Sequence, residues 1–277
     1  MRPRAIAWTL AVLLVLGGVA YGAWRGYDWV TSQVVRERCW VPVEGADDLA
    51  LTWEQSRNAA IITAVSYQQG LSEQAAVIAL ATAWQESGLR NINYGDRDSL
   101  GLFQQRPSYG WGTEEEIMDP WYSSRRFYEE LVKFPDWETT DVNDIAQKVQ
   151  RSGHPEAYRK HETNARALAG ALRGSAPESL GCVDRDDVPG NPHAFEQVVA
   201  QVPGVTSAVE GTVATLTSAD PAALWAATHL ALANTREAGI VSATIGDRAW
   251  VQSRNRGQWG DASEPVPQGT AVIELRG

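Results

Sequence analysis

The sequence predicts a mainly α-helical fold, in which a helical domain over residues 50–176 is followed by a small α+β unit over residues 193–277. Segments with helix caps and apolar residues at helical spacing fill the first region. β-Branched segments separated by turn residues fill the end of the second region. Between them, residues 177–192 are rich in Gly, Pro and Asp and predict a linker. A chain of 277 residues with 44% hydrophobic content is sufficient for one large or two modest domains.

Caps, apolar spacing and proline in the first turn predict five helices in the first domain. They run over residues 52–69 and 72–88, begin at Pro120 and at Asp141, and run from Pro155 to about Leu172. Thr52 and Gln55 form a capping box for the first, and Gly88 ends the second. Residues 89–112, rich in Asn, Asp, Gly and Ser, predict a long loop, and such loops in compact domains are often functional.

The second unit combines helices and strands. Helices are expected near residues 194–201 and from Pro221 to about Glu237. Strands are expected over residues 240–245, 249–253 and 271–275, with Gly246 and Asp247 as a hairpin turn. No motif in this unit indicates a function.

Composition argues against two classes of function. The chain carries 24 Lys and Arg against 34 Asp and Glu, a formal net charge of -10, whereas nucleic-acid-binding proteins concentrate basic residues against phosphates. Two cysteines and four histidines, without CxxC or HExxH spacing, are too few for a zinc site. The acidic cluster of Asp184, Asp186 and Asp187 lacks the spacing of a calcium loop. We therefore expect no nucleic acid, no metal and no cofactor.

The amino-terminal segment predicts an extracytoplasmic protein. Arg2 and Arg4 precede an uncharged apolar stretch that, as a helix, would span roughly 30 Å, enough to cross a bilayer. Positive charge before the span places the amino terminus inside. We predict a transmembrane anchor over residues 1–24 and a stalk over residues 25–49, in a single-pass protein of the cytoplasmic membrane. The alternative is a secreted protein whose signal peptide has been cleaved.

Both interpretations of the amino terminus place Cys39 and Cys182 in an oxidising compartment. An even pair of cysteines in such a compartment predicts a disulfide. On the chain-entropy model, closing so long a loop stabilises the fold by up to about 5 kcal/mol.

Glu86 occupies an unusual position for a carboxylate, in the last turn of the predicted helix 72–88. The carbonyl end of a helix carries about half a negative charge, which should raise the pKa of this carboxyl group. A carboxylic acid that stays protonated near neutral pH suits proton donation to a glycosidic oxygen.

Three short motifs surround this residue in order along the chain. Gln85-Glu86-Ser87-Gly88-Leu89, then Gly101-Leu102-Phe103-Gln104, then Ala157-Tyr158 resemble the Glu-Ser, Gly-Leu-Met-Gln and Ala-Tyr motifs of soluble lytic transglycosylases. Residues 94–104 are also similar to the segment of goose-type lysozymes that joins Gly-Asp-Arg to Gly-Leu-Met-Gln. The resemblance covers about residues 50–172, with Phe103 where the motif usually has Met. It implies a lysozyme-like catalytic domain.

The resemblance also implies roles for individual residues. Glu86 matches the catalytic acid/base, and Ser87 matches the serine beside it. Gln104 matches a glutamine that hydrogen-bonds the sugar, and Tyr158 matches the tyrosine close to the acid. The implied reaction cleaves peptidoglycan glycan strands between N-acetylmuramic acid and N-acetylglucosamine, leaving 1,6-anhydro ends.

Two alternatives remain open on the sequence. A hydrolysing muramidase needs a second carboxylate to activate water, for which Asp96 and Asp98 in the predicted loop are the candidates. The further aspartate of goose-type lysozymes falls near Arg106 here, which favours transglycosylation. The other alternative is a non-catalytic scaffold that binds cell wall.

Aromatic residues in the predicted loop suit contact with sugar faces. The chain has 12 tryptophans, and Phe103 and Trp111 lie in the loop that should face Glu86. We predict that both contact the glycan.

Overall fold

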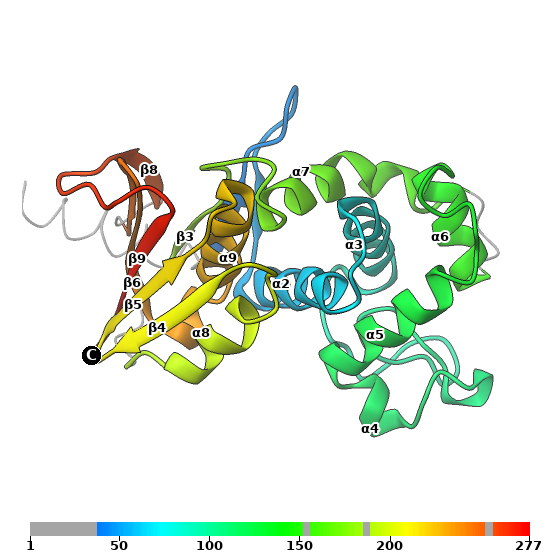
Figure 1. Cartoon of the computed structure of the whole chain (residues 1–277). Helices are drawn as coiled ribbons and strands as arrows, with labels where there is room; N and C mark the ends of the chain where they lie inside the picture. The colour runs from blue at the N-terminus through cyan, green and yellow to red at the C-terminus, as the bar shows by residue number, and fades with distance from the viewer. Residues whose placement is uncertain (1–37, 152–155, 185–188, 253–256) are drawn as a thin grey trace, which may run out of the picture. The chain divides into compact units, whose positions relative to one another are not determined.

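The computed structural model describes residues 38–151, 156–184, 189–252 and 257–277 (Figure 1). The helices are α2 (Trp53–Gln68), α3 (Glu73–Ser87), α4 (Glu114–Ile117), α5 (Pro120–Leu131), α6 (Val142–Gln150), α7 (Glu162–Leu172), α8 (Pro192–Val199), α9 (Pro221–Ala233) and α10 (Thr235–Ala238), with 3-10 turns η1 (Pro107–Tyr109) and η2 (Arg159–His161). The strands are β1 (Arg38–Val41), β2 (Leu49–Leu51), β3 (Gly181–Val183), β4 (Thr206–Glu210), β5 (Val213–Thr217), β6 (Ile240–Ile245), β7 (Arg248–Val251), β8 (Gln258–Asp261) and β9 (Thr270–Leu275).

The prediction of a mainly α fold is wrong. Helices cover 43% and strands 18% of the described residues, and the strands form two antiparallel sheets. One sheet has the order β2-β1-β3 and the other the order β4-β5-β9-β6-β7-β8. The first sheet escaped prediction because its strands have three or four residues each, and because β3 pairs with a strand far away in the chain.

The small sheet contains the predicted disulfide. β1 lies in the segment predicted as a stalk and β3 in the segment predicted as a linker, and the two strands pair with Cys39 opposite Cys182. The bond between these cysteines spans a sequence separation of 143 residues, and both are fully buried. The disulfide prediction is confirmed.

The helix signals of the first region correspond to observed elements. Thr52 and Gln55 form the expected capping box at the start of α2. Gly88 ends α3 in the left-handed conformation with a φ of 65°, which a residue without Cβ adopts easily. Asp119 caps α5, whose first residue is Pro120, and Asp141 caps α6. Pro155, the predicted start of the last helix, lies outside the described residues, and the helix observed there is α7, which begins at Glu162 after η2.

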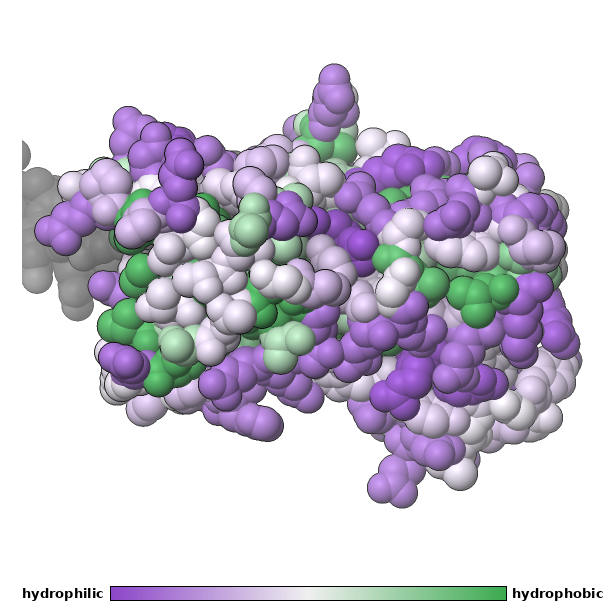
Figure 2. Space-filling model, viewed as in Figure 1, coloured by the Kyte–Doolittle hydropathy of each residue, from purple (hydrophilic) through white to green (hydrophobic). Residues whose placement is uncertain are grey.

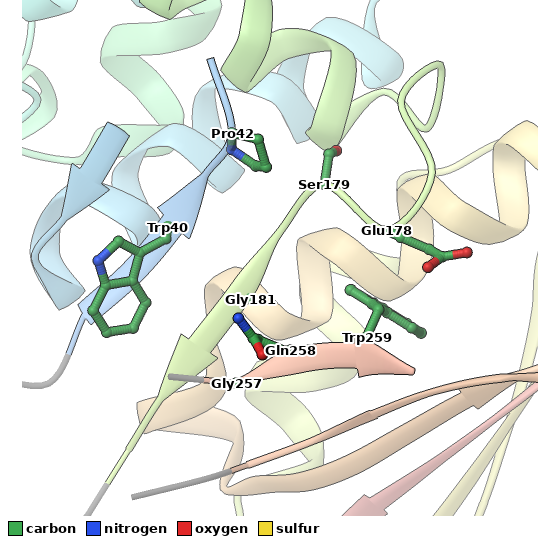
Figure 3. A pocket seen from close by; sticks show the side chains of 8 residues that line it. All are labelled: Trp40, Pro42, Glu178, Ser179, Gly181, Gly257, Gln258 and Trp259. Atoms are coloured by element: carbon green, nitrogen blue, oxygen red, sulfur yellow. The ribbon is translucent and has the colours of Figure 1, made fainter. Parts of the chain in front are cut away.

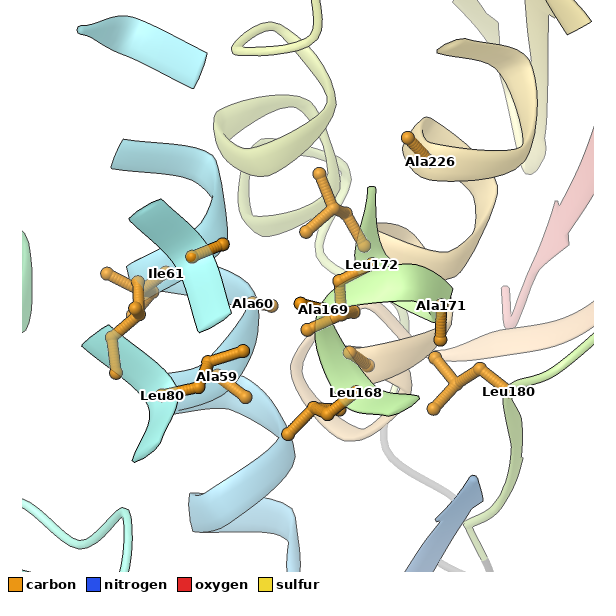
Figure 4. Packing of buried hydrophobic residues seen from close by; sticks show 14 of the residues in the cluster. Ala59, Ala60, Ile61, Leu80, Leu168, Ala169, Ala171, Leu172, Leu180 and Ala226 are labelled. Carbon is orange, nitrogen blue, oxygen red and sulfur yellow. The ribbon is translucent and has the colours of Figure 1, made fainter. Parts of the chain in front are cut away.

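The hydrophobic core is continuous through both predicted domains. Side chains of α7 lie between those of α2 and α3 on one side and Ala226 of α9 on the other (Figure 4). α9 also packs against the large sheet, and ten of its thirteen residues are buried, from Ala223 to Ala233 except Trp225. Ser56 Oγ of α2 donates a hydrogen bond to Ala233 O at the end of α9, at 3.0 Å. Helices and large sheet therefore fold around one core.

The large sheet contains the predicted strands β6, β7 and β9 and three strands that were not predicted. β4 and β5 form a hairpin in which Glu210 pairs with Val213, and β8 is the edge strand beside β7. Hydrophilic residues cover most of the face seen in Figure 2, and its hydrophobic residues form separate patches.

The predicted transmembrane anchor over residues 1–24 lies outside the described residues. Within the described ranges, no helix has the length and apolar composition needed to cross a bilayer. On this finding we correct the predicted localisation. The single-pass membrane location is withdrawn, and nothing in the described residues confirms the secreted alternative.

His229 lies in the core where α7, α9 and β8 meet. Its Nδ1 lies 2.8 Å from Ala171 O, and its ring contacts those of Trp225 and Trp259 at centroid distances of 5.4 and 5.9 Å. Its Nε2 is buried and has no hydrogen-bond partner among the described residues. Burial lowers the pKa of His229 to about 4, against partial opposition from the Ala171 carbonyl and Glu178.

This burial predicts a pH-dependent loss of stability. Because the folded-state pKa of His229 lies below the unfolded value of 6.5, the unfolded state binds the proton more readily. Stability is therefore complete above pH 6.5 and falls as the pH drops towards 4, by roughly 2–3 kcal/mol between pH 7 and pH 4.5. Urea unfolding measures the free energy of unfolding at pH 7 and at pH 4.5. The difference between these two values should be clearly smaller for His229→Asn than for the parent protein. An equal difference in parent and variant would contradict the assignment.

Candidate functional site

The candidate site is built on the carboxyl-terminal end of α3. Residues 75–83 of this helix are all buried, so its position is fixed by packing on every side. The left-handed residue Gly88 then stops the helix. Gln85, Glu86 and Ser87 form the last turn. Gln85 and Glu86 contact the segment around Tyr158, and Ser87 contacts the long loop.

Glu86 contacts the tyrosine that the motifs predicted beside it. Tyr158 Oη donates a hydrogen bond of 2.6 Å to Glu86 Oε1. The tyrosine side chain is fully buried, whereas Glu86 is partly exposed. Asn143 Oδ1 of α6 accepts hydrogen bonds of 3.2 Å from the backbone N–H groups of Tyr158 and Arg159. The phenol is therefore held against the carboxyl group by the core and by α6.

Gln85 makes a second contact with the same segment, which the sequence analysis missed. His161 Nε2 lies 3.1 Å from Gln85 Oε1, and the histidine ring stacks on Trp84 with centroids 6.3 Å apart. Burial, with a smaller contribution from Lys160, lowers the pKa of His161. The available signal was the short distance in sequence between His161 and Tyr158.

Ser87 connects α3 to the long loop. Its buried Oγ lies 2.8 Å from Leu102 O and 3.0 Å from Ala83 O. Gln150 Nε2 of α6 donates a hydrogen bond of 2.8 Å to Phe103 O from the other side. The Gly-Leu-Phe-Gln segment is thus fastened to both helices.

The prediction that Phe103 contacts the glycan is corrected. Its ring is fully buried and stacks on Phe127 with centroids 4.6 Å apart and planes 13° apart. An apolar ring beside α5 is stabilised by this packing and has no surface left for a ligand. Phe103 is a core residue.

Gln104 turns its side chain back onto the loop. Its Nε2 donates hydrogen bonds of 3.3 Å to Tyr94 O and to Gly101 O. A Cβ at Gly95 would lie 1.8 Å from Gln104 Oε1, so this packing requires glycine there. In this conformation the Gln104 amide holds two parts of the loop backbone together. Its hydrogen bonds go to the loop and not to Glu86.

The two loop aspartates differ in their surroundings. Asp98 Oδ2 accepts from Ser108 N at 2.8 Å, and its Oδ1 accepts from Arg106 Nε at 2.6 Å. The hydrogen bonds from Ser108, followed by that from Arg106, hold the pKa of Asp98 well below its usual range. Asp96 is 89% exposed and lies 4.0 Å from Arg97. Asp98 is thus a structural residue of the loop, and Asp96 is the more accessible carboxylate.

Aromatic side chains of the loop are unequally exposed. Trp111 is partly buried against the core, with the guanidinium of Arg126 6.0 Å from its ring centroid. Tyr94 and Tyr109 are 65% and 67% exposed. These two tyrosines are the more accessible rings for a ligand. Across the described ranges, no three His, Cys, Asp or Glu side chains form a group that could hold a metal ion.

A scan against protein-family models and a search of the curated proteins found no match to this chain. The three motifs and the geometry that they adopt are therefore the basis for a functional proposal. The arrangement combines a partly exposed carboxyl group with a buried phenol that donates to it, which is suited to holding a proton-transfer group in one orientation.

The link between Ser87 and the loop predicts a specific effect of Ser87→Ala. The substitution leaves the Leu102 carbonyl without this donor and should cost about 1–3 kcal/mol of stability. Amides of residues 100–105 should exchange faster with solvent in hydrogen-exchange measurements. Ser124→Ala is the matched control, because that buried hydroxyl donates only to Pro120 O within α5. Equal loop exchange in both variants would contradict the role of Ser87.

Proposed function

We propose that this protein is a lytic transglycosylase that cleaves peptidoglycan glycan strands, with Glu86 as the general acid and base. The observation that carries the proposal is the 2.6 Å hydrogen bond from Tyr158 Oη to Glu86 Oε1 at the end of α3. It joins two of the three motifs that resemble those of soluble lytic transglycosylases, although they are 72 residues apart in sequence. The contact of Ser87 with Leu102 joins the remaining motif to the same helix end.

In the proposed reaction, the protonated Glu86 gives its proton to the oxygen between N-acetylmuramic acid and N-acetylglucosamine. The bond from the muramoyl anomeric carbon to that oxygen breaks, and positive charge develops on the sugar. Glu86, now a carboxylate, takes the proton from the muramoyl 6-hydroxyl, whose oxygen attacks the anomeric carbon. The products are a 1,6-anhydromuramoyl end and a free 4-hydroxyl. Tyr158 keeps the carboxyl group oriented throughout.

The engagement of Asp98 supports a mechanism that uses one carboxyl group. Both Asp98 oxygens accept hydrogen bonds within the loop, and the depressed pKa reflects the stability of that arrangement. Its role in closing the loop leaves it poorly suited to activate a water molecule. The exposed Asp96 supports the alternative, a hydrolysing muramidase, in which a second carboxylate serves as base or nucleophile.

Product analysis tests the reaction and its acid together. Purified sacculi are incubated with the full-length protein or with Glu86→Gln, and the released muropeptides are identified by mass spectrometry. The amide keeps the shape of the side chain but removes the titrating proton. Anhydro-muropeptides are expected from the parent and should be lost in the variant. Muropeptides with reducing ends that the parent releases and the variant does not would indicate a muramidase. If neither protein releases muropeptides, a wall-binding scaffold is indicated.

The same assay resolves the contribution of Tyr158. Tyr158→Phe should lower the rate of product release about 10- to 100-fold, because a hydrogen bond to a charged group is worth roughly 1.5–3 kcal/mol. Tyr128→Phe is the matched control, since Tyr128 is also fully buried and donates its hydroxyl proton to Ile62 O at 2.9 Å. If both variants lose the same activity, the effect of Tyr158 is a general loss of stability.

A further inference from the structure

A second candidate binding site lies where the edge strands of the two sheets meet. The seam pocket, as we name it, encloses about 360 Å³ between β1, β3, the segment before β3 and β8. Trp40 and Trp259 lie on opposite sides of it, with Gly181, Gly257 and Gln258 between them (Figure 3). Its volume lies within the range of about 300–1,000 Å³ typical of small-molecule sites.

The floor of the seam pocket is formed by backbone in tight contact. A Cβ on Gly181 would lie 2.2 Å from Gly257 O, and a Cβ on Gly257 would lie 2.3 Å from Cys182 O. Only glycine allows the two strands to approach so closely. The disulfide from Cys182 to Cys39 then fixes β1, and with it Trp40, beside this floor. The pocket is preorganised.

The opposite wall is equally rigid. Trp259 Nε1 donates a hydrogen bond of 2.9 Å to Leu180 O, which fastens β8 to the segment before β3. Its ring packs edge to face on Trp225, with centroids 4.8 Å apart, and His229 lies against both. Trp40 and Trp259, the two tryptophans that line the seam pocket, are both partly exposed.

A second pocket adjoins the first. It encloses about 660 Å³ and is lined by Trp225, by Leu224 and by the β6–β7 turn. Glu178 lines both pockets, and its φ of 55° holds it in the left-handed conformation at their boundary. Three tryptophan rings line the two pockets: Trp40 and Trp259 in the seam pocket and Trp225 in its neighbour. Glu178 lies between the two pockets.

The charges of the lining select the class of ligand. Arg248 is the one cationic side chain among the described residues that line the two pockets. It donates to Glu178 through Nε and Nη2, at 2.9 and 2.7 Å, and through Nη1 to Asp261. Its charge is already neutralised, which disfavours an anionic ligand. The seam pocket is polar because it is lined by Glu178, Ser179 and Gln258. A polar lining disfavours a purely apolar ligand.

A neutral ligand with many hydroxyl groups satisfies both constraints. Amide and carboxylate side chains hydrogen-bond hydroxyl groups, and aromatic faces pack on the C–H surfaces of sugar rings. We propose that the seam pocket and its neighbour form a second saccharide site, which holds a β-1,4-linked N-acetylhexosamine strand away from the end of α3. The saccharide class follows from the lining, whereas the choice of N-acetylhexosamine rests on the proposed function.

Calorimetric titration with chitohexaose, the soluble β-1,4-linked hexamer of N-acetylglucosamine, tests this site. The full-length Glu86→Gln protein is used so that the probe is not cleaved. Two binding events are expected. Adding Trp40→Ala should weaken one of them about tenfold, equivalent to ~1.4 kcal/mol, which is the scale of a stacked aromatic contact. Gln258→Ala should weaken the same event, and because Gln258 is exposed, this variant keeps the test valid if Trp40→Ala folds poorly.

Trp137→Ala is the matched control, since this tryptophan is also partly buried but lines neither pocket. It should leave both binding events unchanged. Chitohexaose binding that is absent, or that is insensitive to both Trp40→Ala and Gln258→Ala, would overturn the proposal. Binding that depends on Trp40 in a protein that cleaves no peptidoglycan would preserve the saccharide site and reject only the proposed function.

Discussion

The end of α3 is the constraint on which the candidate site depends. The helix is buried over residues 75–83 and stops at Gly88, so packing fixes the position of its last turn. From that turn Glu86 reaches Tyr158, Ser87 reaches the Gly-Leu-Phe-Gln segment, and Gln85 reaches His161. Proton transfer requires a carboxyl group held in one orientation, and the end of a well-packed helix provides this more reliably than a loop. The surrounding loop is ordered by contacts to this helix end.

The carboxyl-terminal part of the chain supports the helices directly. α9 lies between α7 and the large sheet, and the disulfide joins β1 to β3 within the small sheet, which contacts the same helices. His229, Trp225 and Trp259 form an aromatic cluster at this junction. The cluster stabilises the fold and also forms one wall of the proposed saccharide site. Changes in this part of the chain should therefore affect both stability and binding of a glycan.

Local sequence signals made the helices predictable. The short strands and the packing of the loop side chains depend on contacts between distant residues, and the sequence did not indicate them. Thr52, Gly88 and Asp119 mark helix ends through contacts within a few residues, and Gly246 with Asp247 marks a hairpin for the same reason. The short strand β3 pairs with β1 across 143 residues of sequence, so no local pattern indicated it. Phe103 was misjudged because its burial depends on stacking against Phe127, which is distant in sequence. The orientation of the Gln104 side chain depends on the backbone of the loop, which no local pattern indicates. The pairing of Glu86 with Tyr158 was anticipated through the motifs rather than from helical periodicity.

The most direct test of the central claim is a crystal structure of the Glu86→Gln protein with bound chitohexaose. A glycosidic oxygen is predicted within about 3 Å of the side chain at position 86, which is the reach required for proton transfer. The phenol of Tyr158 should keep its contact with that side chain in the complex. Sugar rings bound elsewhere on the protein, with none at the end of α3, would contradict the assignment of Glu86 as the acid.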